Sequence, residues 1–386
     1  MTPANRTSMH QQLKVLCIAD MNVYAKGRAR ARALTELGVE VIAATHTRIG
    51  GEDRGYPEFS LAYRVAHRLG YHLDTERANG TLRDALKSRP PDLVWIEKGT
   101  MIRPSTLRHV KTTHPCLPVV SYSDDDMFLD HNRTRAYVKG LGFYDCVFTT
   151  KARNRDAHEL PALGARRVVV VDKAFDAHQH HPVEVGERDR EDLGGDVGFI
   201  GTYETERAQS LLFLAQNGVR VRVWGNGWES PGEGHPNLRI EGRAVVNTDA
   251  DLRYTRAICA TRINLGFLRK LNRDRHTDRS IEIPACAGFL LAERSEDHVR
   301  LFAEDREAVF FATPDELLAK VRHYLANETE RAAIAEAGRR RCLDSDYSET
   351  GRMRFMLAEV LGPQALGTPP TGPGAGRPHR RRSSSP

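Results

Sequence analysis

Long apolar runs, closely spaced cysteines and abundant aromatic residues are all missing from this sequence. No apolar stretch in its 386 residues approaches the ~20 residues that a membrane-spanning helix needs. Residues 1–12 are polar and lack the apolar segment of a signal peptide. We therefore expect a cytoplasmic protein with no integral membrane segment.

The six cysteines are scattered along the chain. The closest pair, Cys259 and Cys286, is too widely spaced for a C-x-x-C zinc or redox motif. Several cysteines lie inside apolar runs, where a reduced buried thiol is the usual state, and this favours a reducing compartment. The three histidines within 178–181 have no carboxylate or cysteine at ligand spacing. We therefore predict no metal site.

Aromatic residues make up 7% of the chain, and part of its net charge of +6 comes from the tail R-P-H-R-R-R at 377–382. A dedicated nucleic-acid binder would combine a concentrated basic face with aromatic side chains. We therefore expect no nucleic-acid partner. A hydrophobic content of 40% and a charged content of 28% are typical of a soluble globular protein, and the length suffices for two domains.

The region 13–175 alternates short apolar segments with helical ones, which predicts a parallel sheet in a Rossmann-like domain. The expected strands are 13–19, 39–45, 93–97, 117–122, 144–151 and 168–172. The expected helices are 27–37, 58–70, 75–88, 104–111 and 131–140, with one more directly after Lys151. The charged segment 176–194, which contains a proline, is typical of an inter-domain linker.

The same alternation returns over 195–345 and predicts a second Rossmann-like domain. A helix at 346–361 is long enough to pack back onto the first domain. Residues 1–12 and the Pro/Gly/Ser/Arg-rich tail 362–386 are expected to be disordered. Two such domains with a returning helix form the α/β architecture called GT-B. The pattern also fits other twin-Rossmann proteins such as periplasmic binding proteins, against which the absent signal peptide counts.

The stretch 264–288 combines the end of an apolar strand, a basic loop and the start of a helix. Cationic side chains and a helix N-terminus together favour anion binding. Glu282, one turn into the helix, is a carboxylate that can accept hydrogen bonds from hydroxyl groups. A diphosphate next to sugar hydroxyls describes a nucleotide-sugar. A solvated basic loop before an ordinary helix is the alternative. The cations are Arg269, Lys270, Arg273, Arg275 and Arg279.

Three carboxylates, Asp124, Asp125 and Asp126, follow directly on the apolar strand that ends near Tyr122. In open α/β sheets, ligands bind at the carboxyl ends of the strands. The alternative is a cluster of helix-capping aspartates.

Several segments together resemble the spore-maturation-type (CgeB-like) glycosyltransferases. The resemblance covers roughly residues 90–360 and implies the GT-B fold and a nucleoside-diphosphate sugar as co-substrate, with no other cofactor. The segments are V-V-S-Y-S-D-D-D-M-F at 119–128, Y-D-C-V-F-T-T-K at 144–151, G-F-I-G-T-Y-E-T-E-R at 198–207, V-W-G-N-G-W at 223–228, R-K-L-N-R-D-R-H-T-D-R-S-I-E-I-P-A-C-A-G-F at 269–289 and E-A-V-F-F-A-T-P-D-E-L at 307–317.

The segment 269–289 is also similar to the E-x7-E donor motif of retaining GT-B glycosyltransferases. Glu282 matches the second acid, which in those enzymes binds the ribose hydroxyls. Asp274 stands in place of the first acid, which contacts the sugar, and its side chain is one methylene shorter. The resemblance therefore implies a retaining hexosyltransferase, with Asp274 facing the donor sugar.

The same resemblance assigns roles to further residues. The diphosphate would be held by Gly201, Thr202 and Arg207, with Gly225 in the turn after the next strand. Lys270 and Arg279 would offset the charge of the leaving group without a metal, which GT-B enzymes usually do with cations and a helix dipole. His276 is a further candidate near the donor.

Asp124 and Asp125 are expected to face the cleft from the first domain, where one of them orients or deprotonates an acceptor hydroxyl. The loop 20–27 should line the acceptor side. The acceptor itself is open: a glycan, a protein, a lipid-linked intermediate or a small metabolite. Two other functions remain, a GT-B-fold nucleotide-sugar epimerase and a nucleotide-sugar-binding protein that has lost turnover.

Overall fold

The computed structural model describes residues 12–50, 60–87, 89–228, 234–242 and 244–366. Most of the predicted disordered start and tail, and parts of the helices expected at 58–70 and 75–88, lie outside the described residues. None of the described helices is long and apolar enough to cross a bilayer.

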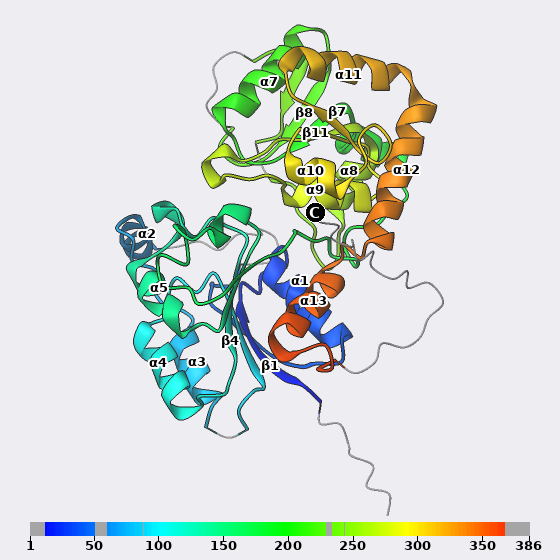
Figure 1. The fold of residues 1–386 in the computed structure, drawn as a ribbon. Helices are drawn as coiled ribbons and strands as arrows, with labels where there is room; N and C mark the ends of the chain where they lie inside the picture. The colour runs from blue at the N-terminus through cyan, green and yellow to red at the C-terminus, as the bar shows by residue number, and fades with distance from the viewer. Residues whose placement is uncertain (1–11, 51–59, 88, 229–233, 243, 367–386) are drawn as a thin grey trace, which may run out of the picture.

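Two six-stranded sheets form the centres of two domains, drawn one above the other in Figure 1. The first sheet has the strand order β2-β1-β3-β4-β5-β6, and every neighbouring pair is parallel. Its strands are β1 (Lys14–Ala19), β2 (Glu40–Thr45), β3 (Leu93–Glu97), β4 (Val119–Ser123), β5 (Cys146–Thr149) and β6 (Val168–Val170). The central strands β3 and β4 are buried along their whole length, as expected inside a parallel sheet with both faces covered.

The second sheet has the order β12-β11-β10-β7-β8-β9 and is also parallel throughout. Its strands are β7 (Gly195–Ile200), β8 (Val221–Trp224), β9 (Leu238–Ile240), β10 (Thr261–Gly266), β11 (Leu290–Glu293) and β12 (Val309–Phe311). The predicted pair of Rossmann-like α/β units is therefore confirmed.

Helices cover both faces of each sheet, so each domain has apolar clusters on the two sides. The first domain carries α1 (Lys26–Glu36), α2 (Leu61–Arg68), α3 (Ala78–Asp84), α4 (Pro104–Thr113) and α5 (Arg135–Gly140). The second carries α7 (Thr205–Gln216), α8 (Arg253–Ala260), α9 (Asp278–Ala285), α10 (Glu296–Leu301), α11 (Pro314–Ala326) and α12 (Glu328–Asp344), and the short α6 (Glu187–Asp192) precedes its first strand.

The helix expected directly after Lys151 does not form, and this prediction was wrong. Ala152–Arg155 makes only a short 3-10 turn. Asn154 in this turn is fully buried, and its side-chain amide donates to Asp126 (2.7 Å) and Glu159 (3.0 Å). These local side-chain hydrogen bonds fix an alternative to a continued helix.

The last helix, α13 (Glu349–Leu361), returns the chain to the first domain. It follows α12 out of the second domain and lies beside α1 in Figure 1. Met353, Met356 and Leu357 are buried in the apolar cluster that contains Val15 and Cys17 of β1. The C-terminal helix therefore forms part of the core of the N-terminal domain.

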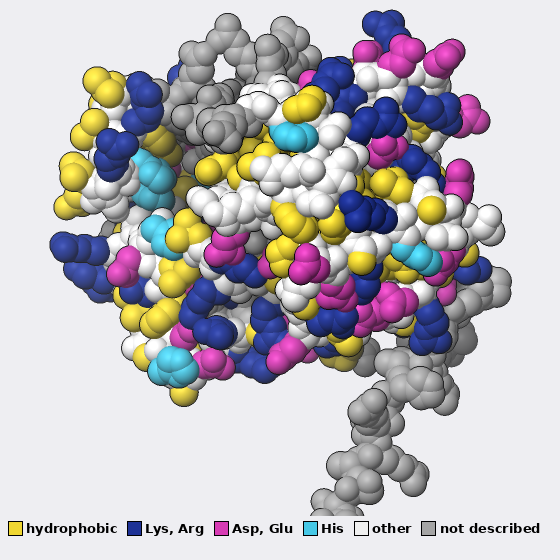
Figure 2. Space-filling model, turned by 90° about the horizontal axis from the view of Figure 1, so that it is seen from above, with side chains coloured by type: hydrophobic (Ala, Val, Ile, Leu, Met, Phe, Trp, Pro, Cys, Tyr) yellow, Lys and Arg dark blue, Asp and Glu magenta, His cyan; other side chains and the backbone are white. Residues whose placement is uncertain are grey.

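In the lower half and on the right of the face shown in Figure 2, Lys and Arg side chains are mixed with Asp and Glu side chains.

Candidate active site

Two cavities lie between the domains, at the carboxyl ends of strands from both sheets. The larger, of about 240 Å³, is bounded by the loop after β1 and by residues of the second domain around Trp224, Val245 and Glu282. The smaller, of about 200 Å³, is bounded by Asp124 and Lys173 on one side and residues 267–279 on the other. The carboxyl edge of a parallel sheet is the usual ligand-binding edge of α/β proteins.

The two cavities share a wall that is formed by the turn after β7 and the start of α9. Gly201, Thr202, Asp278 and Arg279 line both cavities. The helix α9 begins after a capping box in which Thr277 and Ser280 bond each other's backbone N–H groups. The predicted strand, basic loop and helix at 264–288 are confirmed, and the positive end of the helix dipole borders both cavities.

Glu282 lies on the inner wall of the larger cavity and is 5% exposed. One carboxylate oxygen accepts a hydrogen bond from the Lys26 ammonium at 2.5 Å, and the other accepts from the Tyr254 hydroxyl at 2.6 Å. Burial would raise the pKa of Glu282, but the attraction of Lys26 and His180 outweighs it and holds the pKa below its usual range. Glu282 is therefore an anion that is bound to the opposite domain through Lys26.

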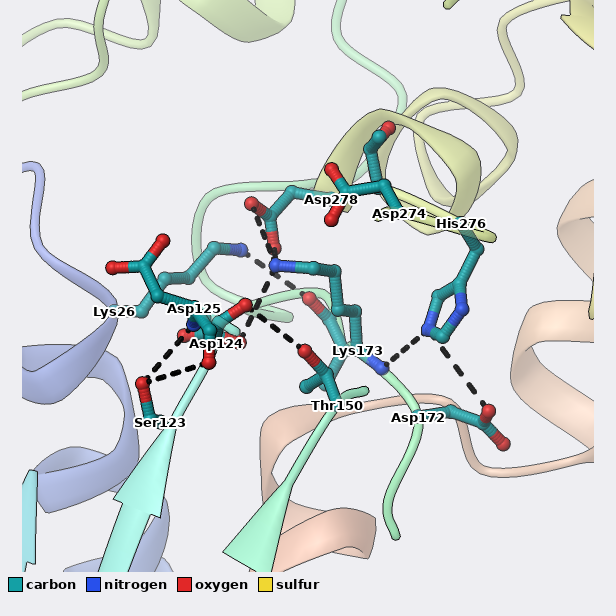
Figure 3. Close-up of polar contacts among 12 residues, drawn as sticks. Lys26, Ser123, Asp124, Asp125, Thr150, Asp172, Lys173, Asp274, His276 and Asp278 are labelled. Atoms are coloured by element: carbon teal, nitrogen blue, oxygen red, sulfur yellow. Dashed lines mark hydrogen bonds and ion pairs between the residues drawn. The ribbon is translucent and has the colours of Figure 1, made fainter. Parts of the chain in front are cut away.

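Lys173 joins the two domains at the floor of the smaller cavity (Figure 3). Its ammonium lies 3.4 Å from Asp124 of the first domain and 3.4 Å from Asp278 of α9. Burial favours loss of the Lys173 proton, but the two carboxylates reverse this and raise its pKa. The cation is therefore fixed between two acids.

Asp124 and Asp125 both line the smaller cavity, and both are held as anions. Burial raises the pKa of Asp124, but Lys173 and Arg30 lower it to about 2. Asp125 accepts a hydrogen bond from Lys98 at 2.5 Å. Burial raises the pKa of Asp125, but the charge and hydrogen bond of Lys98 outweigh it and lower the pKa. A carboxylate with so low a pKa is a weak proton acceptor, so these acids are better suited to orienting a hydroxyl than to deprotonating it.

Asp274 faces the same cavity from the second domain. Its carboxylate forms an ion pair with Lys151 of the first domain and accepts a hydrogen bond from Asn272 at 3.1 Å. The structure therefore brings the three predicted catalytic acids, Asp124, Asp125 and Asp274, into one cavity.

The predicted phosphate-binding turns also meet. Gly225 lies in the larger cavity, and a Cβ atom on it would stand 1.8 Å from the carbonyl oxygen of Gly201. Only glycine permits this close approach of the two turns. Arg207 reaches the smaller cavity from the first turn of α7 and donates to the carbonyl of Thr202 at 3.0 Å. Burial lowers the pKa of Arg207, and the neighbouring cations Arg279 and Arg269 lower it further, while Glu204 opposes them. An anion bound here would relieve the repulsion among these three arginines.

Two predicted donor residues lie outside both cavities. The half-exposed Lys270 forms an ion pair with Glu293 at 2.6 Å. His276 is buried, and its Nε2 accepts the backbone N–H of Lys173 at 3.0 Å (Figure 3). Its Nδ1 lies 3.2 Å from Asp297. Lys270 and His276 therefore line neither cavity: the first forms a surface ion pair and the second fixes the backbone of Lys173.

Sequence reasoning assigned the loop 20–27, which contains Lys26, to the acceptor side, and the structure places residues 23–26 along the larger cavity. It missed Lys173, Asp278, His180 and Tyr254, which line the cavities. Lys173 follows shortly after β6, so its position after a strand end was the available signal. His180 belongs to the 178–181 cluster, and burial lowers its pKa to about 4. Within the described residues, no group of three or more His, Cys, Asp or Glu side chains is arranged to hold a metal ion.

Comparison with known proteins agrees with this geometry. Residues 207–358 match a family model described as glycosyl transferase-like. The chain has the GT-B fold. An α-glucosyltransferase solved with UDP and DNA superposes with a TM-score of 0.62 at 11% identity, over 91% of this chain and 100% of that one.

Two further structures superpose over similar lengths. Sucrose-phosphate synthase from Thermosynechococcus elongatus has a TM-score of 0.57 at 12% identity, covering 90% of this chain and 98% of that one. HepE of Anabaena, solved with UDP-glucose, has a TM-score of 0.56 at 11% identity, covering 90% and 100%. Such low identities establish the fold alone. No curated protein sequence matches the chain significantly.

Proposed function

We propose that this protein is a glycosyltransferase that moves a hexose from a nucleoside-diphosphate sugar to an acceptor hydroxyl, with retention of configuration and without a bound metal. The observation that carries the proposal is Glu282, a buried anion on the wall of one cavity, which shares a helix N-terminus with a second, acid-lined cavity. The matched region 207–358 contains this carboxylate and the helix.

In this proposal the nucleoside occupies the larger cavity. Glu282 accepts hydrogen bonds from the ribose hydroxyls. Its two carboxylate oxygens are already held in place by donors, one by Lys26 and the other by Tyr254. Because HepE was solved with UDP-glucose and the α-glucosyltransferase with UDP, we expect a UDP-sugar as donor.

The diphosphate would lie at the shared wall, where Gly201 and Thr202 meet the start of α9. Arg279 and Arg207 approach this wall from two helices and would stabilise the growing charge of the leaving diphosphate. These cations and the helix dipole would supply the stabilisation that a metal gives in other transferases.

The sugar would then occupy the smaller cavity, between Asp274 and the pair Asp124 and Asp125. The lowered pKa values of Asp124 and Asp125 favour retention, because inversion needs a competent base on the acceptor side. We propose that these two acids orient the acceptor hydroxyl.

The test is hydrolysis and transfer across a panel of nucleotide-sugars, with the product followed by NMR. We expect a UDP-sugar to be consumed and the anomer of the donor to be released first. Release of the opposite anomer would overturn retention, and an epimerised nucleotide-sugar would make the protein an epimerase.

The matched variants are Glu282→Gln and Glu336→Gln. The second is an exposed glutamate of α12 outside both cavities. Glu282→Gln should weaken UDP binding in calorimetry by at least about tenfold, since a hydrogen bond to a charged group contributes about 1.5–3 kcal/mol. Equal UDP affinity in the two variants would move the nucleotide site elsewhere.

A further inference from the structure

A second concavity lies in the first domain, outside the cleft. It is a groove of about 680 Å³, and none of its lining residues borders the two cavities described above. Its walls are the segment 69–74 after α2, the loop 100–103 after β3, and residues 130–139, which include the start of α5. Figure 1 shows α2 and α5 near each other at the left edge of the lower domain.

One wall of this α2–α5 groove is apolar and faces solvent. Leu69, Tyr71 and Leu73 are 69%, 64% and 45% exposed. The apolar surface continues along α2 with Leu61 and Val65, which share a helical face with Leu69 at four-residue spacing. The helix α2 has no buried residue at all. A contiguous exposed apolar surface of this kind is typical of a protein or membrane interaction site.

The rest of the groove is basic. Arg103, Arg135 and Lys139 are exposed and form no ion pair within the described residues. The two carboxylates in the lining are already engaged, because Asp74 accepts the N–H groups that begin α3 and Asp130 pairs with Arg133 at 2.6 Å. An anion in this groove would therefore meet cations that have no competing partner.

Basic residues also border the apolar face of α2 along one side. Arg64 and Arg68 are exposed and unpaired within the part of the chain that the structure describes. Figure 2 shows hydrophobic side chains next to Lys or Arg side chains along its left edge, the side on which Figure 1 places α2. A helix with an apolar face beside basic residues can bind in the plane of an anionic membrane surface.

The groove and the reaction cleft border the same loop. Lys98 begins the loop and holds Asp125 of the smaller cavity at 2.5 Å. Two residues later, Thr100 lines the groove, and its carbonyl accepts the Thr134 hydroxyl at 2.7 Å. The groove and the smaller cavity therefore contact the same short loop, at Thr100 and through the Lys98–Asp125 ion pair respectively.

We propose that the α2–α5 groove holds the acceptor, and that this acceptor is an anionic lipid taken from a membrane surface. Its phosphate group lies against Arg103, Arg135 and Lys139, and its apolar chain lies against Leu69, Tyr71 and Leu73. The face of α2 that carries Leu61 and Val65 rests on the bilayer. The assignment of the lipid as acceptor rests on the proposed transferase function, whereas lipid binding does not.

The experiment is co-sedimentation of the full chain with vesicles of phosphatidylcholine, with and without phosphatidylglycerol. We expect binding only to the anionic vesicles. Arg135→Glu/Lys139→Glu should reduce this partition by at least about tenfold, since each basic residue near an anionic surface contributes about 1 kcal/mol. The matched control is Arg306→Glu/Arg340→Glu, two exposed arginines of the second domain outside the groove, which should bind as the unchanged chain does.

Three results would overturn the proposal. If the groove variant and the control bind the anionic vesicles equally, the groove takes no part in the interaction. Binding that disappears when residues 367–386 are deleted would assign it to the basic tail. If the chain is a dimer without vesicles and Val65→Asp makes it a monomer, a second copy of the chain covers the apolar face. UDP calorimetry on the same variants separates the two proposals, because it tests the donor site alone.

Discussion

The carboxyl group of Glu349 makes the stability of this protein depend on pH around neutrality. It lies on the first turn of α13, is 5% exposed, and stands 3.6 Å from the Arg30 guanidinium. Burial raises its pKa from 4.5 to about 7, and the attraction of Arg30 and Lys26 recovers only part of this effect. The neighbouring anions Asp124 and Glu97 add to the rise.

The folded protein therefore holds this proton more tightly than the unfolded chain does. Where the folded state binds more protons, the free energy of unfolding falls as pH rises, here between about 4.5 and about 7. Glu349→Gln removes the titration and keeps the shape. The free energy of unfolding of the variant should exceed that of the unchanged protein by a margin that grows with pH. The part of this margin that comes from the titration is about 1 kcal/mol at about pH 5 and about 3 kcal/mol at about pH 8.

Urea denaturation at several pH values between these limits measures the difference directly. A control with Glu336→Gln, an exposed position, should show no such trend. A stability difference between Glu349→Gln and the unchanged protein that stays constant across the range would refute the reasoning, because it would mean that the buried carboxyl titrates as it does in the unfolded chain.

Three further outcomes follow from the contacts in the cleft. Gly225→Ala places a methyl 1.8 Å from a carbonyl oxygen and should cost about 1–3 kcal/mol of stability, measured by thermal unfolding, whereas Gly186→Ala, in open space, should not. Arg273→Ala leaves two buried carboxylates, of Asp126 and Glu159, without their partner and should cost about 3–5 kcal/mol in urea unfolding. Asp124→Asn should lower turnover about 100-fold through misplacement of the acceptor and leave the UDP affinity within about twofold; a loss confined to UDP affinity would contradict this.

The sheets could be predicted from the sequence because their central strands are mostly apolar. β3 opens with four apolar residues and β4 with two valines, and both strands are buried at every position. The stretch 264–288 was equally visible, since its strand, loop and helix are local in the chain.

The pairing inside the cleft could not be predicted in the same way. Lys26 and Glu282 are 256 positions apart, and they meet only because the two domains face each other at one orientation. Periodicity and spacing carry no information about that orientation. The same holds for Lys173, whose two acidic partners lie on different domains.

The cations of the basic loop show the limit most clearly. In the sequence, Lys270, Arg273 and Arg279 are equivalent charges in one loop. In the structure Lys270 faces Glu293, Arg273 crosses to Asp126 and Glu159, and Arg279 alone of the three lines both cavities. Which way each side chain points depends on the turn at Arg273, whose φ of 49° reverses the backbone there.

The return of α13 to the first domain has a consequence for synthesis of the chain. Met353, Met356 and Leu357 complete the apolar layer over β1, so the N-terminal domain lacks a wall of its core until residue 361 has left the ribosome. By then every strand of the second domain has been made. The half of the molecule that is translated first is therefore the half that can finish folding last, and a fragment ending at the linker would expose the apolar surface that α13 covers.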